Sequence, residues 1–457
     1  MTRHSDPYLA SFSDFNINET VDKKAKEFIG EKSAGEFFYP ALIFSRSATL
    51  LIFFVIGIFM VNTADASGFA LTEQNGAGAG YAYAGAAAVP QDASTVFFNP
   101  AGMTYLRPGH HVAGAASILM TSLRFKDTGS IAFPAGPLGD NGGQAGGVFV
   151  VPAGYWSMSI NPSLRLGLGV SPTFGDITDW SKSFIGRYQG TSSQIITVNT
   201  NPSIAWRMND VISLGAGLNI VRFDANLRGM APVPTPIDPG TTVTGGGFGV
   251  GYNLGAMFQV LPQTRVGITY RSTITLDLDG HFEGLGRKIP TSAPIKLPDT
   301  ISVAISHIFT DRLHFLADFT WTGWSSIPAL TVQSRINGAT LINEGLGFKD
   351  SFRVGFGTQY QYNDRLRLKA GVAYDQSPIR NAMDRTVRLP DSDRTMLAVG
   401  FNQKIGQRTS VDVGYIHVFF DKAQIDRPTS NPLSLPLVRG SFSNSADIVS
   451  VQLNHQF

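Results

Sequence analysis

The last ten residues, "IVSVQLNHQF", constrain the possible folds more than any other stretch of the chain, because apolar and polar side chains alternate along them. One face of an extended chain would carry Val449, Val451, Leu453, His455 and Phe457, with polar residues in between. A period of two with a polar second face predicts a strand between an apolar and an aqueous environment.

Similar segments recur towards the N-terminus, rich in Val, Ile, Thr, Tyr and Phe with interspersed Gly. The clearest cover residues 264–282, 314–324, 352–362, 366–375 and 410–420. We place fourteen strands, centred near residues 117, 152, 168, 198, 217, 254, 272, 302, 318, 356, 370, 399, 414 and 451. Short polar turns alternate with Pro/Gly-rich stretches at residues 232–247, 284–298, 377–394 and 422–444. Such alternation distinguishes the periplasmic end of a membrane barrel from its outer end.

The strands are expected to close into a membrane barrel. After Val61 no apolar run approaches the length that a membrane-spanning helix needs. A closed barrel satisfies every backbone group without water, and an even strand number is usual in single-chain bacterial barrels. We therefore predict an all-β fold, a 14-stranded antiparallel transmembrane β-barrel over residues 107–457, in the outer membrane of a Gram-negative bacterium. The terminal Phe457 resembles the assembly signal of such barrels, so the barrel-assembly machinery is an expected partner.

Charge and cysteine content exclude several classes of protein. Charged residues make up 15% of the chain, against roughly 25% in ordinary soluble domains. The net charge of +2 gives no reason to expect nucleic acid as a partner. The chain has no cysteine, which rules out disulfides and thiolate metal sites and is compatible with an oxidising compartment.

The N-terminal region is predicted to be processed. Residues 48–61, "ATLLIFFVIGIFMV", form an apolar run that follows Arg46 and precedes the small residues Ala64 and Ala66. This pattern predicts a signal peptide over residues 46–66, with an uncleaved anchor as the alternative. Residues 1–45 form a polar extension that is expected to be disordered or absent.

Residues 67–106 are expected to fill the lumen. Fourteen strands enclose more space than side chains alone can fill. This segment lacks a period of two and is crowded with Gly and Ala, which allow compact packing inside a tube. We therefore predict an N-terminal hatch, or plug, over residues 67–106.

At this point the sequence resembles the FadL family of outer-membrane transporters for long-chain fatty acids and other hydrophobic compounds. The resemblance starts with Gly68-Phe69 and covers essentially the whole chain after the signal peptide. It rests on many pieces in order, among them "GAGAGYAYAGAAAVPQDASTVFFNPA", "VPAGYW", "ITYRS", "TGWSS", "GFKDSFRVGFGTQY", "VAYDQSPI", "LPDSDR" and "SVDVGY".

The resemblance implies a lateral route for the substrate. In this family the substrate is captured at the outer face, moves to a pocket above the hatch and leaves through an opening in the wall. The opening comes from a kink in the third strand, which Asn-Pro-Ala of the hatch contacts. Here these residues are Asn99, Pro100 and Ala101, and the kink is expected at Ser171, Pro172 and Gly175. Proline lacks the N–H that a sheet interior requires, so Pro172 agrees with a kink, although it could merely begin an outer loop.

Residues that recognise a polar head group are less clear. Arg228, at the outer end of the fifth strand, is one candidate for a fatty acid carboxylate. Family members that carry fatty acids have Lys shortly before "GFKD", and the corresponding place here holds Glu344. A carboxylate would repel a fatty acid, which favours an aromatic hydrocarbon or an alkane, unless the alignment slips in this loop.

Two other classes of protein share part of this pattern or need to be distinguished from it. An enzyme would need a nucleophile or metal motif, and the sequence has neither G-x-S-x-G nor H-E-x-x-H. A general diffusion porin would share the alternation but not a Gly/Ala-rich plug. We therefore predict a non-enzymatic uptake channel without catalytic residues, metal or other cofactor. It would act as a monomer, with a hydrophobic small molecule and outer-membrane lipid as its contacts.

Overall fold

The computed structural model describes residues 68–131, 138–232, 239–428 and 437–457, all within one unit, Met60–Phe457. The predicted polar extension, the signal peptide and Ser67 lie outside the described residues. Within the described ranges, no helix is long and apolar enough to cross a membrane.

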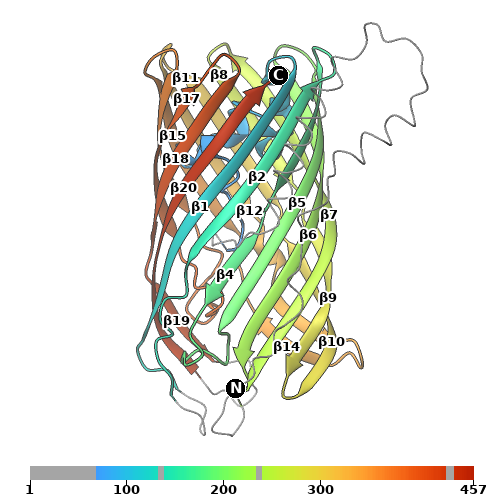
Figure 1. Cartoon of the computed structure of the whole chain (residues 1–457), viewed down its shortest axis with the longest axis vertical. Helices are drawn as coiled ribbons and strands as arrows, with labels where there is room; N and C mark the ends of the chain where they lie inside the picture. Colours follow the sequence, from blue (N-terminus) through green and yellow to red (C-terminus); the bar gives the residue numbers. More distant parts are fainter. Residues whose placement is uncertain (1–67, 132–137, 233–238, 429–436) are drawn as a thin grey trace, which may run out of the picture. The chain divides into compact units, whose positions relative to one another are not determined.

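Fourteen antiparallel strands in the described part of the chain form a closed ring (Figure 1). In ring order they are β1 (His110–Asp127), β2 (Val148–Ser159), β3 (Leu164–Ser171), β5 (Ser192–Arg207), β6 (Ile212–Met230), β7 (Gly240–Leu261), β8 (Thr264–Arg271), β11 (Thr300–Ile308), β12 (Leu313–Thr322), β15 (Ser351–Gln361), β16 (Leu366–Asp375), β17 (Arg394–Lys404), β18 (Thr409–Phe420) and β20 (Leu437–Gln456). The ring closes where β20 pairs with β1, from His111 opposite Gln456 to Asp127 opposite Gly440. The predicted 14-stranded barrel is therefore confirmed.

Six shorter strands belong to the end of the barrel that carries the long connections. They are β4 (Gly175–Asp179), β9 (Ile274–Gly284), β10 (Arg287–Leu297), β13 (Ala329–Ser334), β14 (Thr340–Gly345) and β19 (Ala423–Pro428). They correct three expectations. The single strand predicted over residues 264–282 is divided at Ser272 and Thr273, so the predicted centre at 272 falls between β8 and β9. The stretch 284–298, predicted as a loop for its Pro and Gly, contains β10, which tolerates two prolines because its second edge pairs with β13 only at Thr291 and Ser292. The stretch 422–444, also predicted as a loop, contains β19.

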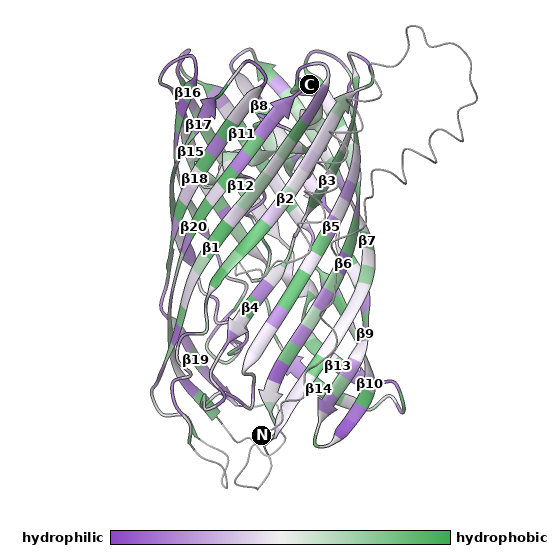
Figure 2. Ribbon diagram, in the orientation of Figure 1, coloured by the Kyte–Doolittle hydropathy of each residue, from purple (hydrophilic) through white to green (hydrophobic). Residues whose placement is uncertain are grey.

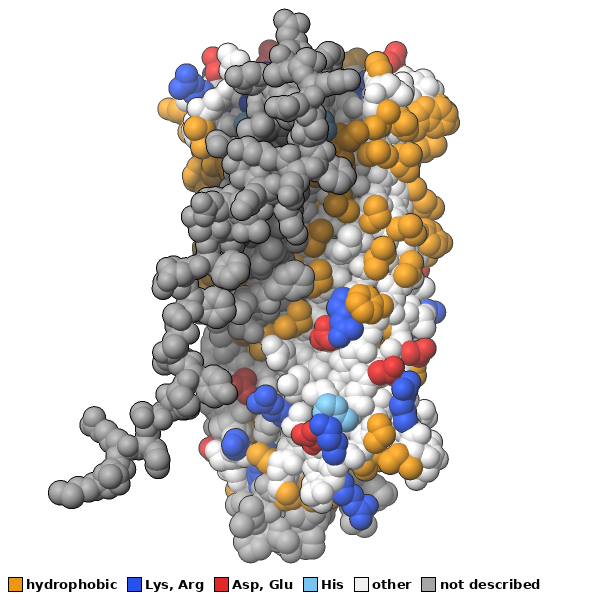
Figure 3. Space-filling view, turned by 45° about the vertical axis from the view of Figure 1, so that its right-hand side comes forward, with side chains coloured by type: hydrophobic (Ala, Val, Ile, Leu, Met, Phe, Trp, Pro, Cys, Tyr) orange, Lys and Arg blue, Asp and Glu red, His pale blue; other side chains and the backbone are white. Residues whose placement is uncertain are grey.

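The alternation places polar side chains inside the ring and apolar ones outside. Ser450 and Gln452 on β20 are fully buried, whereas Val451 and Leu453, which alternate with them, are about half exposed. Figure 2 shows this alternation of hydropathy along the strands. On the face seen in Figure 3, apolar side chains gather over the half of the barrel nearest the short turns, and charged ones lie over the other half and at the rim beyond the apolar side chains. The first half is therefore suited to contact lipid.

The N-terminal segment, residues 68–106, lies inside the ring (Figure 1). It contains four short helices, α3 (Gly76–Ala79), η2 (Ala86–Ala88), α4 (Thr95–Phe98) and η3 (Pro100–Tyr105). A further short helix, η4 (Trp324–Ser326), follows β12. Glycines of the wall allow the close packing: a Cβ on Gly371 would lie 2.3 Å from the Tyr81 carbonyl oxygen. Glycine therefore recurs on these strands because the segment approaches the wall backbone.

Candidate functional site

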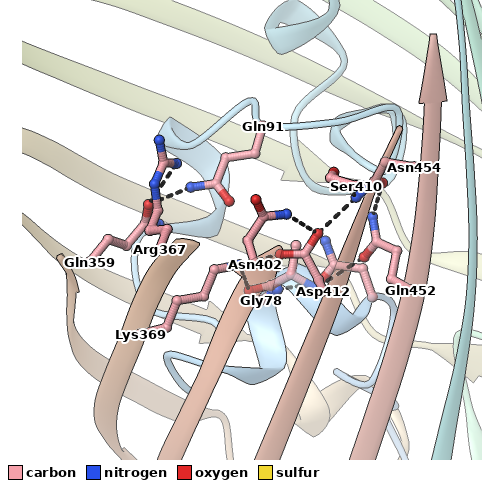
Figure 4. A network of polar contacts seen from close by, with 12 residues as sticks. Gly78, Gln91, Gln359, Arg367, Lys369, Asn402, Ser410, Asp412, Gln452 and Asn454 are labelled. Atoms are coloured by element: carbon pink, nitrogen blue, oxygen red, sulfur yellow. Dashed lines mark hydrogen bonds and ion pairs between the residues drawn. The ribbon is translucent and has the colours of Figure 1, made fainter. Parts of the chain in front are cut away.

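A buried ion pair attaches α3 to the wall (Figure 4). Lys369 on β16 and Asp412 on β18 approach to 2.6 Å with almost no exposure. The Lys369 ammonium also donates to the carbonyl of Ala77 at 2.9 Å. The second Asp412 oxygen accepts from the amides of Asn402 and Asn454, at 2.9 and 2.7 Å. Because all these groups are satisfied together, the network fixes α3 against β16, β17 and β18.

A second buried pair holds the turn after α3. Arg353 on β15 donates to Asp318 on β12 at 2.7 Å and to the Ala82 carbonyl. The other Asp318 oxygen accepts from the Gly85 amide at 3.1 Å. Ala82 and Tyr83 both have positive φ, a conformation that non-glycine residues keep only where their surroundings fix it. The contacts of Arg353 and Asp318 supply that restraint.

The third strand is interrupted at the predicted place. The pairing of β2 with β3 ends where Gly154 is opposite Val170. The chain then leaves β3 at Ser171, passes through Pro172 and resumes as β4, which pairs with β5. Three residues, 172–174, stand opposite two on β5, which is a bulge. Residues 148–153 of β2 therefore pair with β1 but not with the third strand.

Residues 69–71 occupy the strand edge that β2 leaves. Ala70 forms a bridge with Phe174, flanked by hydrogen bonds from the Leu71 amide to Thr173 and from the Gly175 amide to Phe69, at 2.9 and 2.8 Å. The opposite edge of Phe174 is turned to β5, where its amide and carbonyl both contact the Thr197 hydroxyl. The N-terminal segment thus takes the position of a neighbouring strand at the interruption.

Gln74 joins the two sides of this interruption. Its side-chain amide donates to Pro172 at 2.7 Å and to Leu71 at 3.0 Å. The hydroxyl of Tyr155 on β2 donates to the Gln74 backbone carbonyl at 3.1 Å. Nothing in the sequence marked Gln74, since it stands in no repeated or charged pattern.

The expected contact of Asn99 with the kink is wrong. The Asn99 amide donates to the carbonyls of Ala87 and Ala256, at 2.8 and 3.1 Å, and its oxygen accepts from the Ala101 amide. It therefore caps η3 and faces β7, where Gly255 leaves room for it. The same stretch does reach β3, through Val96 and Met103, which pack over Gly167. Pro100 begins η3 and lies against β6 and β7 with Ala101.

An apolar cluster fills the lumen on the long-loop side of the interruption. Its centre is aromatic: the Phe69 ring lies 5.1 Å from that of Trp324 and 5.6 Å from that of Phe174, and Phe348 packs on Trp324 at 6.0 Å. Aliphatic side chains surround it, including Val221, Leu227, Ile274, Leu276, Ile327, Val332, Ile379 and Leu389. Phe69 and Phe174 belong both to this cluster and to the interrupted strand edge, so the two features are continuous.

The two residues predicted to recognise a head group, Arg228 and Glu344, lie in different surroundings. Arg228 is exposed on the outward side of β6, because its neighbour Leu227 takes the inward position. Glu344 on β14 borders the apolar cluster and pairs with Arg388 at 3.8 Å, with both side chains mostly buried. Burial lowers the pKa of Arg388, and Glu344 opposes this change. The Glu344 carboxylate is thus already matched by a cation that the sequence analysis missed.

Asp391, also missed, ties the start of the described chain to a loop. It accepts from the Gly68 amide at 3.1 Å and from the Ser377 hydroxyl at 2.8 Å. Burial raises the pKa of Asp391 to about 6, although the nearby Arg394 opposes the shift. This carboxyl therefore titrates close to neutral pH while it holds Gly68.

Two concavities help to orient the site. An apolar one of about 540 Å³ lies on the outward face of β5 to β8, beside Ile204, Trp206 and Leu254, so it faces lipid and not the lumen. A polar one of about 250 Å³ lies at the short-turn end between the N-terminal segment and the wall. Gln91, Gln359 and Arg367 line it and are drawn in Figure 4.

Comparisons with known proteins agree with this architecture. The family model described as outer membrane protein transport protein (OMPP1/FadL/TodX) matches residues 57–457. The long-chain fatty acid transport protein of Escherichia coli strain K12 is 27% identical over 436 residues, which cover 82% of this chain and 92% of that protein.

Solved structures show the same fold. That of a Pseudomonas aeruginosa FadL homologue has a TM-score of 0.79 at 24% identity and covers 85% of this chain and all of that one. The Ralstonia pickettii toluene transporter TbuX has a TM-score of 0.63 at 18% identity, over 84% of this chain and 99% of that one. The chain therefore belongs to the OMPP1/FadL/TodX family of transport proteins and resides in the outer membrane of a Gram-negative bacterium.

Proposed function

We propose that this protein takes up long-chain fatty acids or related hydrophobic compounds and releases them sideways into the membrane. The substrate enters at the long-loop end, inserts among the apolar side chains around Phe69 and Phe174, and leaves at the interruption of the third strand. The observation that carries the proposal is the strand edge at Thr173–Gly175, which pairs with residues 69–71 instead of with β2. Displacement of that short pairing would open the wall beside an apolar site.

The alternative exit, through the short-turn end, is less suitable for an apolar molecule. Each CH₂ group that leaves an apolar environment for water loses about 0.8 kcal/mol of stabilisation. The concavity at that end is lined by polar side chains, among them Gln91, Gln359 and Arg367. A lateral exit keeps the chain of the substrate in contact with apolar side chains and then with lipid.

In this proposal residues 68–106 act as a hatch that remains in the lumen. The pairs Lys369–Asp412 and Arg353–Asp318 hold it against strands β12, β15, β16 and β18, away from the third strand. They do so through Ala77, Ala82 and Gly85. Release then requires movement of residues 69–71 alone. The protein would act as a monomer without catalytic step or cofactor, and lipid would receive the substrate. Phe457, whose amide closes β20 on β1 at 2.9 Å, would be recognised by the assembly machinery.

A neutral substrate, such as an aromatic hydrocarbon or an alkane, is the second candidate. The Glu344–Arg388 pair supports it, because the Arg388 charge is already matched at the border of the apolar cluster. Such a pair offers a carboxylate no free cation.

Binding and conductance measurements on the purified protein test the proposal. A long-chain fatty acid and a monoaromatic hydrocarbon are titrated separately, and saturable binding of either supports uptake of hydrophobic compounds. The one that binds more tightly identifies the substrate class. In a planar bilayer the protein should show no large, steady conductance. A permanently open channel would instead identify a general diffusion porin.

A further inference from the structure

Four buried asparagines form a polar belt on the inner face of neighbouring strands. Asn199 and Asn201 lie on β5, Asn219 on β6 and Asn253 on β7, and each is at most 2% exposed. The amides of Asn201 and Asn219 both donate to the Asn253 oxygen, at 2.9 and 3.2 Å. The Asn199 amide donates to the Asn219 oxygen at 3.1 Å. Side-chain amides at this density inside a barrel are a polar site and not a packed apolar core.

Arg271 on β8 completes the belt with a positive charge. It stands directly opposite Asn253 in the pairing of β7 with β8, so their side chains are neighbours. Its guanidinium donates to the Asn219 oxygen and to the Phe97 carbonyl, the latter at 3.0 Å, and lies 4.5 Å from the Phe97 ring. Among the residues that the structure describes, no carboxylate forms an ion pair with Arg271. Arg271 is half-buried, and a cation with restricted access to water and no counter-charge is stabilised when an anion joins it.

Two atoms of the belt lack partners in the described structure. The Asn253 side-chain nitrogen is buried and donates to no acceptor, and the Asn199 side-chain oxygen is buried and accepts from no donor. Exchange of the nitrogen and oxygen of Asn253 would not help, because two amides already donate to its oxygen. Buried polar atoms are nearly always hydrogen-bonded, so the unpaired Asn253 donor indicates a missing acceptor. Because Arg271 lies beside it without a carboxylate partner, an acceptor with negative charge is favoured there.

The belt lies at the height of the wall interruption. Asn199 is opposite Ser171, the last residue of β3, and Asn201 is opposite Gly169. Two positions beyond Asn219 on the inner face of β6, Val221 belongs to the apolar cluster. The N-terminal segment borders the other side through Phe97. A molecule whose apolar chain occupied the cluster could therefore place its polar end in the belt.

We propose that Arg271 and Asn253 form a binding site for the carboxylate of a fatty acid beside the lateral exit. The inference rests on the proposed uptake function and names its substrate class as a long-chain monocarboxylate. One carboxylate oxygen accepts from the Arg271 guanidinium and the other from the Asn253 nitrogen, while Asn199 accepts from a water molecule. Arg228 is exposed on the outward side and Arg388 is paired with Glu344, whereas Arg271 has no paired carboxylate among the described residues.

The test compares an acid with its uncharged counterpart. Dodecanoate and methyl dodecanoate are titrated into the purified full chain, wild type and variants. Arg271→Gln and Asn253→Asp should each weaken dodecanoate binding roughly tenfold or more, the effect of one lost charge-assisted hydrogen bond, and change ester binding less than twofold. Asn253→Asp is the sharper variant, because it keeps the shape and the acceptor and supplies Arg271 with a competing carboxylate.

Arg265→Gln is the matched control. Arg265 lies on the same inner face of β8 but stacks on Tyr105 at 4.1 Å, away from the asparagines. It should leave the affinities for both probes unchanged. Thermal unfolding of each variant verifies folding.

The outcomes separate the two proposals. Equal losses for acid and ester, no loss in either variant, or a structure with dodecanoate in which only water contacts Arg271 would overturn the carboxylate site and leave the uptake function standing. If neither probe binds the wild type saturably, the uptake function fails, and the carboxylate site fails with it.

Discussion

Lys369 and Asp412 show why single residues decide whether the N-terminal segment stays in place. Both side chains are buried, and each has additional partners, Ala77 for the ammonium and Asn402 and Asn454 for the carboxylate. Removal of one member leaves the other as a buried, unmatched charge. Removal of both charges leaves no unmatched charge behind.

Lys369→Met should therefore lower the free energy of unfolding by about 3–5 kcal/mol, the usual penalty for breaking a buried pair from one side. The double variant Lys369→Met with Asp412→Asn should recover a large part of that loss, because the amide keeps hydrogen bonds without a charge. Denaturant unfolding in detergent measures both. A double variant as unstable as the single one would show that the pair does not act as a unit.

Asp391 gives stability a pH dependence. Burial raises its pKa from 3.8 to about 6 in the folded protein, so the folded state binds the proton more tightly than the unfolded state does. The contribution of Asp391 to stability is therefore greatest below pH 3.8, and it is lost as the pH rises through about 6. Wild-type stability should accordingly increase, relative to Asp391→Asn, as the pH falls from 7.5 to 4.5. Thermal unfolding of both proteins across this pH range checks the prediction. A difference in stability between them that did not change with pH would contradict it.

At this scale the sequence predicted little. Charged residues in otherwise alternating strands, such as Lys369 in "LRLKAGVAYD", could have been recognised as inward-facing. Arg228 was a candidate for a substrate carboxylate, but it faces outward, because a shift of one residue along a strand reverses the face and only the register establishes it. The partners of Gln74 and Asn99 depend on contacts between segments far apart in the sequence, and no local pattern encodes them.

Among the elements, the interrupted third strand and residues 69–71 depend on each other. The break itself was predictable, because Pro172 cannot donate to a neighbouring strand. The identity of the replacement partner was not, since Gly68-Phe69 has no strand-like alternation. Gln74 then reinforces the pairing from within the N-terminal segment.

Gln74→Leu should loosen residues 69–71, because the Pro172 and Leu71 carbonyls lose their donor, at a cost of about 1–3 kcal/mol for groups left unsatisfied. Uptake of a hydrophobic substrate should become faster, whereas leakage of small polar solutes should not change, since Lys369 and Arg353 still hold the segment. Radiolabelled uptake by whole cells measures the first and swelling of proteoliposomes the second.

Asn99→Ala is the control for this prediction. It removes the cap of η3 on the side of β7 and should reduce stability by about 1 kcal/mol without altering uptake. Slower uptake in this variant, with Gln74→Leu unaffected, would assign the gating contact to Asn99 instead.

For the whole molecule, the period of two and the alternation of short turns with long loops were enough to predict fourteen strands. All predicted centres except the one near residue 272 lie in strands of the ring. That exception arises where the wall divides at Ser272, and β9 continues the pairing with β7 beyond it. Periodicity is a local property, so it locates strands but does not reveal where a strand exchanges partners.

The central claim is that substrate leaves through the wall where residues 69–71 pair with the third strand. The chain has no cysteine, so a single engineered disulfide can lock this place. Ala70 and Phe174 face each other in an antiparallel bridge whose hydrogen bonds flank them. Such pairs have Cα atoms about 4.5 Å apart, which is within the range for a disulfide.

The measurement is uptake of a radiolabelled long-chain fatty acid by cells that carry Ala70→Cys with Phe174→Cys, before and after reduction. Each single-cysteine variant serves as a control for the lost side chain. The account predicts that the oxidised double variant takes up almost none, that reduction restores uptake to the level of the single variants, and that the single variants do not respond to reductant. Undiminished uptake by the fully cross-linked protein would contradict a lateral exit at this place.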